Sequence, residues 1–124
     1  MFDPERLLHF IELPQFTRRW EQLGLDDEED LSALQFVIIE NPKIGDVVRD
    51  TGGLRKMRFA PPRWNIGKSG ATRVIYAYFD EFGIVLLCLV YGKNEMGDLS
   101  DAVKKLLKKK MNEIEAELRR RKSL

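Results

Sequence analysis

The feature that most constrains the fold is an uninterrupted apolar run, IVLLCLVY, at residues 84–91. A strand of this length without polar alternation is typical of the centre of a sheet, where both faces are covered. The segment at residues 73–80 is also rich in β-branched and aromatic side chains, and only three residues separate the two segments. The sequence therefore predicts a β-hairpin at the centre of the fold.

A third strand is predicted at residues 55–59, where the sequence alternates with a period of two. Lys56 and Arg58 would point to one face of this strand, whereas Met57 and Phe59 would point to the core. The open face of the strand would therefore carry cations.

Helical spacing of apolar residues predicts three helices, at residues 14–23, at residues 26–40 and from residue 98 onward. A short apolar segment at residues 7–13 is predicted as a first strand. The resulting order, β-α-α-β-β-β-α, indicates an α+β fold with a small antiparallel sheet and helices packed on one face. The other face would be open to a ligand, and residues 1–124 would form a single domain.

Charge is distributed unevenly along the chain. Residues 49–73 contain seven Lys or Arg and one acid, Asp50, although the whole chain has a net charge of only +1. A local excess of cations is typical of surfaces that bind a polyanion. The segment therefore indicates a nucleic-acid partner.

Several classes of protein are not indicated. No apolar run approaches the roughly 18 residues that a membrane span needs, and the first residues lack the layout of a signal peptide, so we expect a cytoplasmic protein with no membrane partner. Cys88 and His9 are the only cysteine and histidine, and no phosphate-binding loop or metal-ligand cluster is present. We therefore expect no cofactor and no metal, and we expect Cys88 to be a buried thiol.

The residues that remain on the predicted open face suit the cleavage of RNA without a metal, in which the ribose 2′-hydroxyl is the nucleophile. Cationic side chains would stabilise the charge that develops on the phosphate, and a lysine crowded by cations loses its proton more readily, which makes Lys56 the candidate base. The candidate catalytic residues are Lys56, Arg58, Arg73, Lys93 and Tyr91.

A second group of residues is predicted to bind RNA without taking part in the chemistry. It comprises Arg55, Arg63, Trp64 and Lys68. Trp64 lies between basic residues and would either stack on a base or pack its loop against the core. The residue types alone leave a passive nucleic-acid-binding surface as an alternative to catalysis.

Four motifs occur in a fixed order along most of the chain. They are NPKIGDVV at residues 41–48, TGGLRKMR at residues 51–58, RVIYAY at residues 73–78, and YGKNE at residues 91–95 followed by Asp98 and Leu99. Together they resemble the HigB-type toxins of the RelE/ParE superfamily.

This resemblance implies a toxin of a bacterial type II toxin–antitoxin system, an endoribonuclease that cuts messenger RNA, in many members within the ribosomal A site. It also implies a cognate helix-turn-helix antitoxin, through which alone the toxin would contact DNA. The basic residues that bind and cleave RNA in the RelE branch correspond to Lys56, Arg58 and Arg73.

The sequence departs from the RelE branch at two positions. Asn94 stands where that branch has an arginine, and Ser100 stands near the position of a catalytic tyrosine, so Lys93 or Tyr91 would supply the missing groups. The alternative within the superfamily is a ParE-like inhibitor, which would bind DNA gyrase and cleave nothing.

Overall fold

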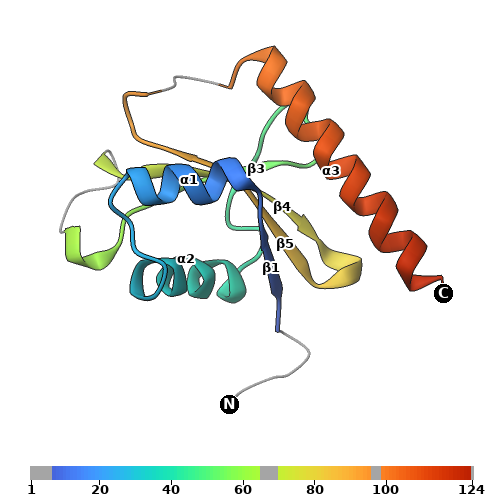
Figure 1. The fold of residues 1–124 in the computed structure, drawn as a ribbon, viewed down its shortest axis with the longest axis horizontal. Coiled ribbons are helices and arrows are strands. Elements are labelled where there is room, and N and C mark those ends of the chain that lie inside the picture. Colours follow the sequence, from blue (N-terminus) through green and yellow to red (C-terminus); the bar gives the residue numbers. More distant parts are fainter. Residues whose placement is uncertain (1–6, 65–69, 96–98, 124) are drawn as a thin grey trace.

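The computed structural model of the chain describes residues 7–64, 70–95 and 99–123. Within these residues, the strands and α-helices follow the order β1-α1-α2-β2-β3-β4-β5-α3 (Figure 1). Their bounds are β1 (His9–Glu12), α1 (Pro14–Gln22), α2 (Glu29–Glu40), β2 (Asp46–Val47), β3 (Arg55–Phe59), β4 (Thr72–Phe79), β5 (Ile84–Tyr91) and α3 (Asp101–Lys122). None of the described helices is long and apolar enough to cross a membrane.

The sheet has the strand order β1-β5-β4-β3-β2, with the predicted β4–β5 hairpin at its centre. It is mixed rather than antiparallel, because β1 pairs with β5 in parallel. A tight hairpin forces its two strands to be antiparallel, but β1 and β5 are far apart in the sequence and no turn dictates their direction. The two-residue strand β2 at the opposite edge was not predicted.

The helices cover both faces of the sheet, which differs from the predicted arrangement. Helices α1 and α2 pack on one face through Phe16, Trp20, Leu34 and Ile38. On the other face, an apolar layer beneath α3 contains its two buried residues, Leu107 and Met111, together with Leu54, Ile75, Leu86 and Cys88. The apolar run of β5 has no polar side to expose to water, so burying it requires cover on both faces.

Strand β5 contains a one-residue irregularity opposite β4. Tyr76 pairs with Leu87 and Ile75 pairs with Leu89, so Cys88 has no partner in the register. Such a β-bulge shifts the alternation of side chains by one position. Leu86 before the bulge, Cys88 within it, and Leu89 and Tyr91 after it therefore all belong to the layer on the α3 face.

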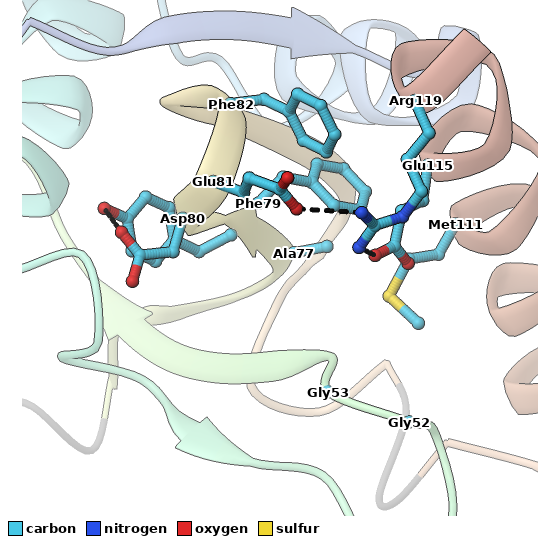
Figure 2. Close-up of a pocket in the computed structure, with 11 residues that line it drawn as sticks. Gly52, Gly53, Ala77, Phe79, Asp80, Glu81, Phe82, Met111, Glu115 and Arg119 are labelled. Carbon is cyan, nitrogen blue, oxygen red and sulfur yellow. Dashed lines mark hydrogen bonds and ion pairs between the residues drawn. The ribbon is translucent and has the colours of Figure 1, made fainter. Parts of the chain in front are cut away.

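The C-terminal half of α3 is attached to the turn between β4 and β5. Arg119 donates to Glu81 at 2.9 Å and to Glu115 at 3.0 Å, and Lys122 donates to Glu81 at 3.1 Å. Both cations also lie over the ring of Phe82, at 5.6 Å and 5.5 Å from its centroid. Figure 2 shows Arg119 reaching from the helix toward Glu81 across a cavity of about 180 Å³.

Candidate active site

Three of the predicted catalytic residues form one row across three strands. In the register, Arg58 of β3 lies directly opposite Arg73 of β4, and Arg73 lies directly opposite Tyr91 of β5. Directly opposite residues in antiparallel strands have Cα atoms roughly 4.5–5.5 Å apart and point to the same face. We call Arg58, Arg73 and Tyr91 the cross-strand row, and it lies on the face that α3 partly covers.

The pairing of two arginines in this row is electrostatically unfavourable. Like charges directly opposite each other destabilise a sheet, and an acidic neighbour normally relieves the repulsion. Among the residues that the structure describes, neither Arg58 nor Arg73 has an ion pair with an acid, and the one hydrogen bond recorded for the Arg73 side chain goes to the carbonyl oxygen of Ala71. A cluster that is costly for the fold is typical of a site that binds an anion.

Lys56 lies one step along β3 from the row and on the same face. Two residues of a strand span roughly 7 Å, so the side chains of Lys56 and Arg58 are neighbours on this face of β3. Its cross-strand neighbours are Ile75 on β4 and Asp46 on β2. Lys56 and Arg73 are half-buried, Arg58 is exposed, and Tyr91 is only 2% exposed.

Lys93 is exposed in the turn that follows β5, two residues after Tyr91. This turn is held by Glu95, whose carboxylate accepts a hydrogen bond of 2.8 Å from the backbone N–H of Gly92. The other oxygen of Glu95 forms an ion pair with Arg19 of α1. Arg19 therefore anchors the turn that carries Lys93, a role that nothing in the local sequence indicated.

Arg55 points to the opposite face of β3, where it supports the loop before β2. Its guanidinium donates to the carbonyl oxygens of Lys43, at 3.2 Å, and Gly45, at 2.7 Å. The hydroxyl of Tyr76 joins the same loop, because it donates to the carbonyl of Pro42 at 2.8 Å and accepts from the N–H of Gly45 at 2.9 Å. These contacts position β2 beside β3.

Arg63 and Trp64, two further predicted RNA-binding residues, are also separated from the row. Arg63 binds the carboxylate of Asp30 on α2 at 2.6 Å and the carbonyl of Gly24 at 2.9 Å. Its hydrogen bonds hold the pKa of Asp30 below the usual value of an aspartate. Trp64 packs against the core on the α1–α2 face, and Lys68 lies outside the described residues.

Ser100 caps the N-terminus of α3, where its hydroxyl accepts a hydrogen bond of 3.2 Å from the backbone N–H of Val103. The position near which the RelE branch has a tyrosine therefore has a capping role here. Across residues 7–64, 70–95 and 99–123, no group of three or more His, Cys, Asp or Glu side chains is arranged to hold a metal ion.

A cavity of about 320 Å³ opens beside Lys56, between the β2–β3 edge of the sheet and the start of α3. We call it the β2–α3 cavity. Arg49 and Lys104 line it, and neither was predicted as a site residue. Lys104 is 48 positions from Lys56 in the sequence and follows the helical pattern of α3, so only the packing of that helix brings the two lysines together.

No model of a known protein family matches the sequence. Among solved structures, the chain is similar to the isolated RelE toxin of E. coli, with a TM-score of 0.51 and 20% identity over 82% of this chain and 97% of that one. It is also similar to a double arginine-to-alanine mutant of E. coli RelE in the free state, with a TM-score of 0.50 and 20% identity over 72% and 85% of the two chains. The chain therefore has the RelE fold, and the predicted α+β class is confirmed.

Proposed function

We propose that this protein is the toxin of a type II toxin–antitoxin system and a metal-independent endoribonuclease that cuts messenger RNA. The observation that carries the proposal is the pairing of Arg58 with Arg73 across two strands, without acidic partners among the described residues. Two guanidinium groups on one face can bind the non-bridging oxygens of a phosphate, and this interaction offsets the repulsion between them. The RelE fold and the four sequence motifs are consistent with this proposal.

In the proposed reaction, the 2′-oxygen of a ribose forms a bond to the adjacent phosphorus, and the bond from phosphorus to the 5′-oxygen of the next nucleotide breaks. A base removes the 2′-proton, and an acid protonates the leaving 5′-oxygen. The products are a 2′,3′-cyclic phosphate and a 5′-hydroxyl. Arg58 and Arg73 stabilise the charge on the phosphoryl oxygens, and their fixed positions on strands preorganise them for this role.

We assign the proton transfers to residues around the row. Lys56 is the candidate base, since it lies on the same face as Arg58 at one step along β3. Lys93 and Tyr91 are the candidates for the acid. Because Tyr91 belongs to the apolar layer on the α3 face, replacing it with phenylalanine tests its hydroxyl without removing its packing.

The partners that we propose follow from the same assignment. The substrate is messenger RNA on the ribosome, with cleavage in the A site, and the protein acts in the cytoplasm. A helix-turn-helix antitoxin inhibits the toxin and provides its indirect contact with DNA. A toxin of the HigB type fits the order of the motifs NPKIGDVV, TGGLRKMR and YGKNE.

The test is induced expression followed by primer extension on a translated message. We expect new 5′ ends within the coding region for the unmodified protein, and at least a hundredfold fewer for Arg73→Ala, because the loss of one preorganised donor costs about 3 kcal/mol in the transition state. Arg18→Ala is the matched control. Arg18 is an exposed arginine on α1, so this substitution removes the same charge at a site away from the row. Uncut messages together with inhibited DNA supercoiling would instead identify a ParE-like gyrase inhibitor.

The absence of a metal requirement is tested separately. Cleavage by the purified toxin on ribosomes should persist when free Mg²⁺ is lowered just short of ribosome dissociation, because the arginines supply the positive charge at the phosphate. The readout is the rate of cleavage of a message held in the A site. A rate that falls in proportion to Mg²⁺ while the ribosomes stay intact would contradict the mechanism.

A further inference from the structure

The β2–α3 cavity has the chemical character of a nucleotide-binding site. Among the residues that the structure describes, its cationic lining residues are Arg49, Lys56 and Lys104, and its acidic one is Asp46. Its apolar wall consists of Val47 and Val48 from the sheet edge and of Leu99 before α3. A volume of about 320 Å³ is at the lower end of the range for small-molecule sites and suits a single nucleotide.

The cations that line the cavity differ in their exposure to water. Lys56 and Lys104 are half-buried, so their amino groups are less screened by water than those of surface lysines. The Arg49 side chain is 92% exposed, and its ion pair with Asp50 is long, at 3.9 Å, and weak. Among the described lining residues, Lys104 and Arg49 can therefore bind an anion, and Asp46 provides an acceptor for a ribose hydroxyl or a base amino group.

The position of the cavity relates it to the cross-strand row. Lys56 lines the cavity and lies roughly 7 Å along β3 from Arg58. This separation is close to the distance between neighbouring phosphates of an extended single strand. A strand of RNA whose reacting phosphate lies at Arg58 and Arg73 would therefore place an adjacent nucleotide at the cavity.

We propose that the β2–α3 cavity is a subsite for the nucleotide next to the scissile phosphate. Lys104 and Arg49 bind its phosphate, and Val47, Val48 and Leu99 contact its base. This inference rests on the proposed ribonuclease function, and it adds two binding residues, Lys104 and Arg49. The packing of α3 on the sheet is then a requirement for binding RNA, because it brings Lys104 to the cavity.

The experiment titrates the protein with a trinucleotide RNA that has deoxyribose at its first and central positions, so that neither phosphate has an adjacent 2′-hydroxyl and the ligand cannot be cut. Binding is followed by NMR at several salt concentrations. We expect Lys104→Ala to weaken binding about tenfold and to lower the slope of log Kd against log salt by about 0.7, the value for one lost phosphate contact to a single strand. Lys104→Arg should keep both.

Lys109→Ala is the matched control. Lys109 is an exposed lysine of the same helix, and at 100° per residue it points about 140° away from Lys104. Its removal should change the affinity less than twofold. Circular dichroism of both variants verifies that α3 is intact.

Inorganic phosphate, titrated alone, separates a nucleotide site from a simple anion site. The trinucleotide should bind at least tenfold more tightly than phosphate and should shift the methyl resonances of Val47 and Val48. Equal affinity for the two ligands, without these shifts, would overturn the assignment of a nucleotide subsite.

Failure of the proposed subsite and failure of the proposed ribonuclease function would give different results. Equal affinity and equal salt dependence of Lys104→Ala and the unmodified protein would overturn the subsite, even if the unmodified protein cuts translated messages. Conversely, failure of the unmodified protein to cut a message would overturn the proposed function. Binding that depends on Lys104 would still support the cavity as a nucleotide site.

Discussion

At the scale of single residues, Gly45 lies where the loop before β2 meets β3 and β4. A Cβ atom at this position would lie 2.9 Å from a ring carbon of Tyr76 and 3.1 Å from the carbonyl oxygen of Lys56. The first of these groups is fixed by two hydrogen bonds and the second belongs to the backbone of a strand. Neither can move away easily, so only glycine fits here.

We therefore expect Gly45→Ala to lower the free energy of unfolding by about 1–3 kcal/mol through overpacking. Tyr76→Phe keeps the ring and removes only the hydroxyl, and it should cost about 1–2 kcal/mol because the N–H of Gly45 loses its acceptor. Urea unfolding followed by circular dichroism measures both. Unchanged midpoints in both variants would show that this loop does not depend on the contact.

The ion pair between Asp30 and Arg63 has a predictable dependence on pH. The hydrogen bond from Arg63 lowers the pKa of Asp30 in the folded protein. The ion pair therefore stabilises the fold fully at a pH above about 4, which is the pKa of an aspartate in the unfolded chain. This stabilisation is lost as the pH falls through the pKa of Asp30 in the folded protein. Asp30 is nearly buried, with a side chain 3% exposed, whereas the Arg63 side chain is 47% exposed.

Asp30→Asn should lower the free energy of unfolding by about 2 kcal/mol at pH 7. The difference from the unmodified protein should shrink as the pH falls below about 4, the unfolded pKa of an aspartate, because protonation of Asp30 removes the ion pair. Urea unfolding over this pH range measures the difference. A difference that stays constant down to pH 2 would exclude the ion pair as its source.

At the scale of elements, hydrophobic periodicity predicts the individual helices and strands well, but it does not predict how they pack against one another. It placed the helix at residues 14–23, the helix ending before Pro42, and the three strands of the hairpin and its neighbour close to their observed bounds. It could not indicate that β1 runs parallel to β5 or that Arg63 binds Asp30, 33 positions away, because these contacts depend on distant segments. The gathering of Arg58, Arg73 and Tyr91 was predictable in part, since strand alternation specifies the face of a residue but not its partner.

Helix α3 shows how an element is held by few contacts. Only two of its 22 residues are buried, and its C-terminal half depends on Glu81 and Phe82 in the β4–β5 turn. The groups involved are about half exposed, so each ion pair contributes little to global stability. The attachment should therefore open locally before the rest of the fold unfolds.

We expect Glu81→Gln to increase amide hydrogen exchange in the last two turns of α3 and to shift the methyl resonance of Met111, which lines the cavity beneath the helix. Global stability should change by less than about 1 kcal/mol. Glu117→Gln is the control, because Glu117 binds Arg120 and Arg121 within the same helix. It should leave the Met111 resonance in place, and an equal shift in both variants would contradict the proposed attachment.

At the scale of the whole molecule, one sheet separates two apolar layers, and Cys88 lies within the layer on the α3 face. Its thiol is completely buried, and burial raises its pKa to about 12. A thiol reacts as the thiolate, so both access and ionisation are prevented while the protein is folded. Its reactivity therefore reports on the unfolding of the entire sheet.

A maleimide or disulfide reagent should label Cys88 in the native protein at least a hundredfold more slowly than in the urea-unfolded chain. The labelling rate should rise with urea in parallel with the loss of circular dichroism. The measurement needs no substitution, because Cys88 is the only cysteine. Rapid labelling under native conditions would show that α3 and the sheet separate without global unfolding.

The bulge at Cys88 also affects which kinds of mutation the site can tolerate. Residues after the bulge face the opposite way from the one that strict alternation along β5 would give them, so the single extra residue turns Tyr91 toward Arg73. Inserting one further residue between Leu89 and Val90 would exchange the faces of Val90 and Tyr91 without changing either side chain. The site is thus encoded partly in the number of residues in β5, and an insertion after the bulge can remove the site while every side chain of the row is kept.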